Sequence, residues 1–141
     1  MRKYSSWVVA SALLFALVVT GTHVAAEEEH KAPHGGLLLE TGDEAAHLEL
    51  VHDAAAGKVT VYILDDKATG ALAIADAPKL NLKTEKGNAA VALTAVDAKD
   101  GKASKYEATD DALKSKTLNG RIACTIKEKK YNIDVKSEPK K

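Results

Sequence analysis

Residues 47–64 read His-Leu-Glu-Leu-Val-His-Asp-Ala-Ala-Ala-Gly-Lys-Val-Thr-Val-Tyr-Ile-Leu. Two runs in this stretch, 47–52 and 59–64, repeat apolar side chains with a period of two, as in a strand with one buried face. The second run is also rich in the β-branched residues that strands favour. Between the runs, 53–58 contains Gly57 and marks a turn. The stretch therefore predicts two strands joined by a turn.

Similar short runs recur along the rest of the chain, separated by turn residues, about every eight to twelve residues. Residues 110–116 predict one helical turn capped by Thr109 or Asp110, and 71–77 predict either a strand or an irregular crossing. The pattern favours an all-β fold, an antiparallel immunoglobulin-like sandwich of about seven to eight short strands rather than a small barrel. The further predicted strands are 37–40, 80–83, 89–96, 105–108, 121–127 and 131–135.

The first 26 residues predict a cleaved signal peptide. A basic start at Arg2 and Lys3 precedes an uninterrupted apolar and small-residue run over 7–19. Val24-Ala25-Ala26 then fits a small-x-small cleavage site. Because the run is shorter than the about 20 residues that span a bilayer, a permanent anchor is the weaker alternative. We expect a periplasmic or secreted protein with no membrane association after cleavage. Its expected parts are a flexible tail over 27–33, a single β-sandwich domain over 34–136 and a polar tail over 137–141.

Composition argues against several classes of function. The chain carries 20 basic and 20 acidic residues, and only 4% of its residues are aromatic. Without a basic block before Lys140 or a set of stacking side chains, we expect no nucleic-acid partner. The sequence motifs of nucleophilic enzymes, zinc proteases and phosphate-binding enzymes are missing, so we expect no enzyme. Cys124 is the single cysteine and lies on the apolar side of a predicted strand, where burial is expected.

Four of the five histidines lie within residues 30–52. Imidazole and carboxylate groups are the usual protein ligands of transition metals, so this segment raises the question of a metal site. Leu48 and Leu50 are expected to face the core, which turns His47 and Glu49 to the outer face of the same strand.

Register decides which of these side chains meet. A turn centred near Gly42–Asp43 predicts that Leu37 lies opposite Leu48, that Gly36 lies opposite Glu49, and that His34 lies near Val51. His34 and His47 would then be about 13 Å apart, too far to share one ion. We therefore predict a site made by Glu49 with His34, which His47 can join only from the far side of Glu49 and His30 from the tail. His52 points inward at the strand end. The predicted metal ligands are His34, Glu49, His47 and His30.

Imidazole nitrogen and carboxylate oxygen ligands favour metal ions of borderline softness, so we predict Zn, Cu(II) or Ni. A Cu(I) site is disfavoured because Met1 is the only methionine. The alternative is that these side chains form an ordinary solvated surface. The protein would then be a non-catalytic structural or protein-interaction β-domain without metal.

Four pieces of sequence carry a resemblance: Pro33-His34-Gly35-Gly36, Gly42-Asp43, His47-Leu48-Glu49-Leu50-Val51 and the run from Val59 to Asp65. Over about residues 33–66 the chain resembles a segment of the periplasmic adaptor proteins of heavy-metal efflux pumps and of a group of small exported bacterial proteins. The resemblance implies a periplasmic β-domain with a role in metal handling and with metal-efflux components as partners. It identifies no ligands, and the chain lacks the length and long helical hairpin of an adaptor.

Overall fold

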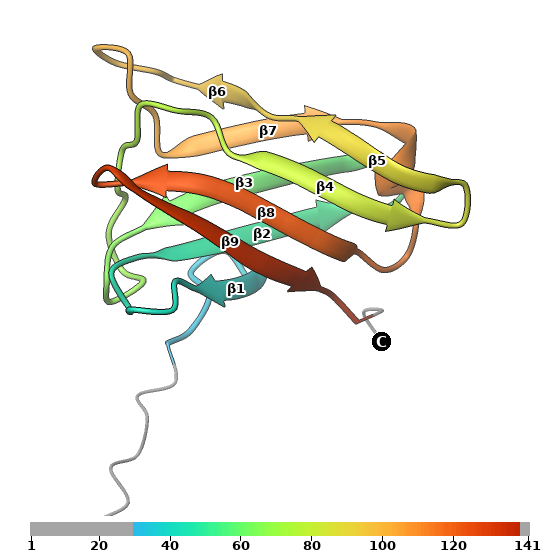
Figure 1. Ribbon diagram of the computed structural model, residues 1–141, viewed down its shortest axis with the longest axis horizontal. Helices are drawn as coiled ribbons and strands as arrows, with labels where there is room; N and C mark the ends of the chain where they lie inside the picture. The colour runs from blue at the N-terminus through green and yellow to red at the C-terminus, as the bar shows by residue number, and fades with distance from the viewer. Residues whose placement is uncertain (1–29, 139–141) are drawn as a thin grey trace, which may run out of the picture.

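The computed structural model describes residues 30–138 (Figure 1). The predicted signal peptide over 1–26 lies outside the described residues. Within residues 30–138, no helix is long and apolar enough to cross a membrane. Nine strands and one 3₁₀ turn make up the regular structure of this part of the chain.

The strands form two sheets that pack face to face. The first sheet contains β1 (Leu37–Glu40), β2 (His47–Asp53), β3 (Lys58–Leu64), β6 (Thr94–Val96) and β7 (Lys105–Thr109). The second contains β4 (Lys79–Thr84), β5 (Gly87–Ala92), β8 (Asn119–Ile126) and β9 (Lys129–Lys136). The 3₁₀ turn η1 (Asp111–Lys114) connects β7 to β8 and lies within the predicted turn over 110–116. Asp110, one of the two predicted caps, accepts a hydrogen bond from the amide of Ala112 at 2.8 Å through its side chain.

The order of strands confirms the predicted antiparallel sandwich. The first sheet runs β1-β2-β3-β7-β6 and the second β5-β4-β8-β9, and every pairing of neighbours is antiparallel. Taken in chain order, β2 to β9 have the A-B-E-D and C′-C-F-G arrangement of immunoglobulin-type sandwiches. β1 is an additional strand that extends the first sheet beyond β2 (Figure 1).

The strand count exceeds the prediction because residues 89–96 do not form one strand. The run is divided at Leu93, which is buried, and its two parts join different sheets as β5 and β6. Periodicity alone cannot show such a crossing, since both parts keep a strand-like pattern. Residues 71–77 form the irregular crossing that was one of the two predicted alternatives, with only isolated bridges at Ala71 and Ile74.

The space between the sheets is filled by the apolar positions of the alternating runs. Leu48, Leu50 and Val61 are at most 2% exposed, and Tyr106 lies among them with its hydroxyl 3.1 Å from the carbonyl oxygen of Ile74. This packing accounts for the burial of Leu48 and Leu50 and leaves His47 and Glu49 on the opposite face of β2, as parity predicts.

A polar contact joins the β1–β2 loop to the second sheet. Asp43 Oδ2 accepts hydrogen bonds from Lys129 Nζ at 2.6 Å and from the Tyr131 hydroxyl at 2.9 Å, both on β9. These two donors hold the pKa of the Asp43 carboxyl well below its usual range. The loop that carries β1 into β2 is therefore anchored to β9 on the opposite sheet.

Candidate metal centre

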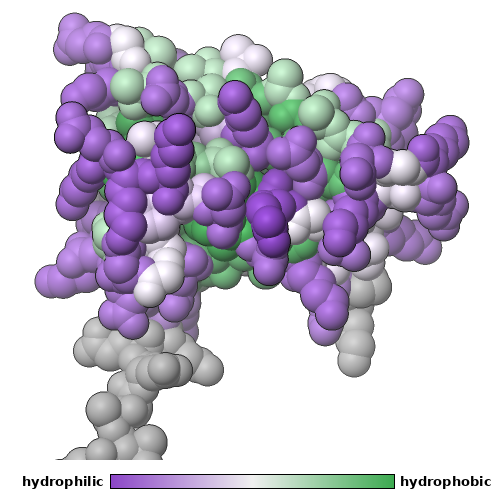
Figure 2. Space-filling view, in the orientation of Figure 1, coloured by the Kyte–Doolittle hydropathy of each residue, from purple (hydrophilic) through white to green (hydrophobic). Residues whose placement is uncertain are grey.

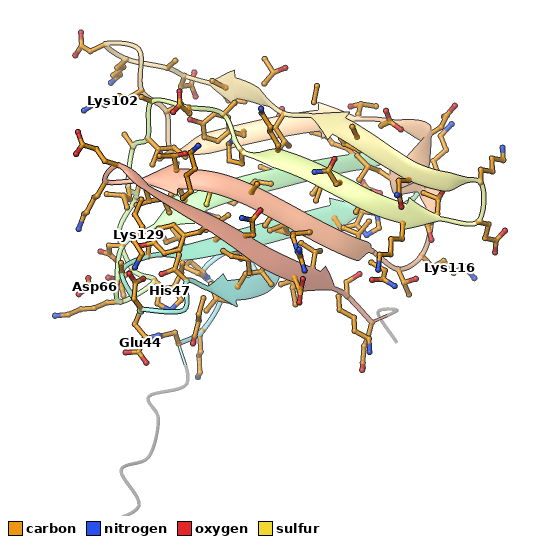
Figure 3. The ribbon with its side chains drawn as sticks, viewed as in Figure 1. Glu44, His47, Asp66, Lys102, Lys116 and Lys129 are labelled. Atoms are coloured by element: carbon orange, nitrogen blue, oxygen red, sulfur yellow. The ribbon has the colours of Figure 1, made fainter. Side chains whose placement is uncertain are left out.

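The candidate residues lie on the outer face of the first sheet, where the chain enters the sandwich. His47 is at the end of the molecule that also carries the loop residues Glu44 and Asp66 (Figure 3). Residues 30–36 cross this face before β1 begins, and the side chains of His30 and His34 contact β2 from this segment. The site is therefore assembled from the N-terminal segment, β1 and β2.

The register of β1 and β2 differs by two residues from the prediction. Leu37 lies opposite Leu50, and Glu49 lies opposite Leu38 instead of Gly36. The connection is a four-residue loop, because the amide of Thr41 donates to the carbonyl of Ala46 at 3.1 Å. A shift of two residues leaves every side chain on the same face of its strand. The predicted faces are therefore correct, although the predicted cross-strand partners are wrong.

Glu49 is completely buried by the segment that crosses it. Its Oε1 accepts hydrogen bonds from the backbone amides of His34 at 2.8 Å and Gly36 at 2.9 Å, and its Oε2 accepts from His34 Nδ1 at 2.7 Å. A Cβ atom on Gly36 would collide with the backbone carbonyl of Leu50, so only glycine allows this approach. The predicted pairing of Glu49 with His34 is present, and Glu49 holds the segment against β2 through three hydrogen bonds.

His34 presents its second ring nitrogen away from Glu49. Its ring stacks on Tyr62 with 3.7 Å between ring centroids and 5° between planes, and its side chain is 41% exposed. Tyr62 lies opposite Glu49 on β3, so the two contacts orient the imidazole from neighbouring strands. No other His, Cys, Asp or Glu among residues 30–138 groups with His34 and Glu49 into a set of three ligands.

His47 is completely buried and oriented by a backbone contact. Its Nδ1–H donates to the carbonyl oxygen of Asp65 at 3.0 Å, which leaves a lone pair on Nε2 when the ring is neutral. That Nε2 lies 3.0 Å from His30 Nδ1, and the two rings meet edge to face at 85°. His30 thus lies against His47 and not against His34 or Glu49, the pair with which it was predicted to act.

Glu40 completes this group and was missed from the sequence. Its Oε1 lies 3.7 Å from His47 Nε2 and 3.9 Å from His30 Nδ1, distances too long for direct hydrogen bonds. Glu40 lies directly opposite His47 on β1, so the two side chains share a face. The predicted register places Glu40 opposite Ala45. The observed register pairs Glu40 with His47, and this cross-strand pairing is the signal that could have identified Glu40 as a ligand.

The three ligand atoms surround a point at metal-bonding distance from each of them. A triangle with sides of 3.0, 3.7 and 3.9 Å has a circumscribed radius of about 2.1 Å, the length of Zn–N and Zn–O bonds. The hydrogen bond from His47 Nδ1 to a backbone carbonyl is the kind of outer contact that orients metal-binding imidazoles. Because the Glu40 side chain is 55% exposed, water can reach further coordination positions.

His52 and Cys124 take no part in this group. His52 Nε2 lies 2.6 Å from the carbonyl oxygen of Leu113 in η1, on the inner side as predicted. Cys124 is buried, and this burial raises the pKa of its thiol to about 11.

Comparison of the chain with protein-family models, with curated proteins and with solved structures gives no significant match.

Proposed function

We propose that this protein binds a divalent transition metal through His30, Glu40 and His47. The observation that carries the proposal is the convergence of two imidazole nitrogens and one carboxylate oxygen around a point about 2.1 Å from each. In the metal-free protein, His30 Nδ1–H donates to His47 Nε2. His30 would bind a metal ion as its Nε2–H tautomer, with the proton now on Nε2, so that its Nδ1 and His47 Nε2 would both face the ion together with the Glu40 oxygen.

The donor set favours Zn, Cu(II) or Ni. Two imidazoles and a carboxylate suit these borderline ions, whereas no thioether or accessible thiol lies among the described residues for Cu(I). A site with three protein ligands and an exposed side differs from the closed four-ligand sites of structural zinc. It suits an ion that must be loaded and released.

Binding or delivery of metal outside the cytoplasm is the role that we propose for this site. The supporting features are the signal-like residues 1–26 and the resemblance of residues 33–66 to the efflux adaptor segment. On this proposal the partners are metal-efflux components in the periplasm.

Calorimetric titration with Zn(II), Cu(II) and Ni(II) tests the proposal. We expect 1:1 binding clearly tighter than about 0.1 mM for at least one ion, weakened about tenfold or more by Glu40→Gln or His30→Gln. Glu44→Gln is the matched control, because Glu44 is an exposed carboxylate in the neighbouring loop, and this variant should bind as the wild type does.

His34→Gln distinguishes this site from the one predicted at His34 and Glu49. The His34 variant should keep most of the affinity. Unchanged binding in both the Glu40 and His30 variants, or no binding tighter than about 0.1 mM by any of the three ions, would refute the proposed site.

A further inference from the structure

One edge of the sandwich lacks the charged residues that usually protect free strands. Residues 87–96 contain no Asp, Glu, Lys, Arg or Pro, and they are the longest uncharged run within residues 30–138, although 28% of the whole chain is charged. They form β5 and β6, the outermost strands of the two sheets on this side. An edge strand without charge, proline or cover is a template for pairing with another strand.

The opposite side of the sandwich is protected. β9, the other edge of the second sheet, carries Lys129, Lys130, Asp134 and Lys136. β1, the other edge of the first sheet, has four residues and contacts β9. The side of the sandwich formed by β1 and β9 is therefore protected by the charges of β9, by the shortness of β1 and by the contact between them, whereas the side formed by β5 and β6 carries no charge.

The unprotected edge is accessible. Asn88, Ala90 and Ala92 on β5 are exposed, while Val91 points into the core. Weakly hydrophobic residues follow the upper rim of the molecule in Figure 2, where β5 and β6 lie in Figure 1. Because β5 pairs with β4 on one side only, alternate residues turn their backbone N–H and C=O groups outward from the sheet.

We propose that β5 pairs with β5 of a second copy of this chain, antiparallel, about a two-fold axis near Ala90. Two identical strands in antiparallel pairing are related by such an axis, so one edge supplies both halves of a closed dimer. Each four-stranded sheet then continues into its partner across the interface.

The sequence of β5 suits pairing with itself. With the axis near Ala90, Asn88 meets Ala92 of the other copy and Ala89 meets Val91, so no like charges are opposed. Glu85 and Lys86 lie in the β4–β5 turn, away from the axis. Equivalent self-pairing of β9 would bring lysines close to lysines, which argues for β5 as the self-pairing strand.

Analytical ultracentrifugation of the full chain tests this inference. A short strand interface is small, so we expect a monomer–dimer equilibrium with a dissociation constant on the order of 10–100 µM. Ala90→Lys places two like charges at the axis and should raise this constant about tenfold or more. Asn132→Lys, an exposed substitution on the opposite edge strand, should leave it unchanged.

Charge exchange makes the test specific for this geometry. Ala90→Glu alone should also weaken association, whereas a mixture of Ala90→Lys and Ala90→Glu chains should associate at least as well as the wild type. Circular dichroism should show that both variants are folded, because the Ala90 side chain is exposed. A wild-type monomer at about 500 µM, or a dimer that neither variant weakens, would overturn the proposal. Metal binding at His47 is measured separately and does not affect this outcome.

Discussion

At the scale of single residues, the informative feature is a pair of buried polar side chains on the outer face of β2. His47 and Glu49 are both inaccessible, yet every polar atom of each has a partner. Residues 30–36 provide both the cover and most of the partners. These side chains therefore hold the N-terminal segment in place, and the segment in turn brings His30 to His47.

Glu49→Ala should destabilise the protein. The substitution leaves the backbone amides of His34 and Gly36 without their acceptor in a covered position, which costs about 2 kcal/mol in the free energy of unfolding. Urea unfolding measures the change. Glu44→Ala, which removes an exposed carboxylate, is the control and should change stability by less than about 0.5 kcal/mol. Equal stability of the two variants would show that Glu49 does not hold the segment.

Cys124 should be inert in the native protein. Burial raises the pKa of its thiol to about 11, so at pH 8 the reactive thiolate is more than about a hundredfold scarcer than in a free cysteine. A thiol-disulfide reagent should therefore label Cys124 at least about a hundredfold more slowly in the folded protein than in urea. Rapid labelling of the native protein would contradict the burial of this side chain on β8.

At the scale of the elements, periodicity was a sound guide to strands and to their faces. The alternating runs over 47–52 and 59–64 are strands with the predicted sides buried. The register of β1 against β2 was not predictable in the same way. Loops of several lengths could join the two strands and still leave the same side chains on the buried face. The structure selects the closure that pairs Thr41 with Ala46 and lets Asp43 reach β9.

The contact of Asp43 with Lys129 and Tyr131 predicts a dependence of stability on pH. Its folded-state pKa is lower than its unfolded value near 4, so its contribution to stability is present above about pH 4 and is lost as the pH falls below that value. Unfolding measured between pH 2 and pH 6 should show a smaller loss of stability on acidification in Asp43→Asn than in the wild type. Asp66→Asn, in an exposed loop, is the control. An unchanged pH dependence in Asp43→Asn would contradict this contact.

At the scale of the whole molecule, metal binding is linked to folding, because the three proposed ligands converge only in the folded chain. His30, Glu40 and His47 come from the entry segment, β1 and β2. A metal at a hundred times its dissociation constant should stabilise the fold by about 2.7 kcal/mol, which raises the melting temperature by about 10 °C. Differential scanning calorimetry with and without Zn(II) measures this shift. Glu40→Gln should reduce this shift by about half or more and Glu44→Gln should leave it unchanged, and equal shifts in the two variants would count against the linkage.

The all-β class, most of the strands and the faces of the alternating residues on β2 followed from the sequence alone. These properties follow from a period of two and from local backbone preferences, which act between near neighbours in the chain. The tertiary structure decided the register of β1, the division of 89–96 between two sheets and the burial of His47. It also decided that Glu40, and not Glu49, lies with His30 and His47. Those outcomes depend on loop closure and on packing between distant segments, and local periodicity does not encode either.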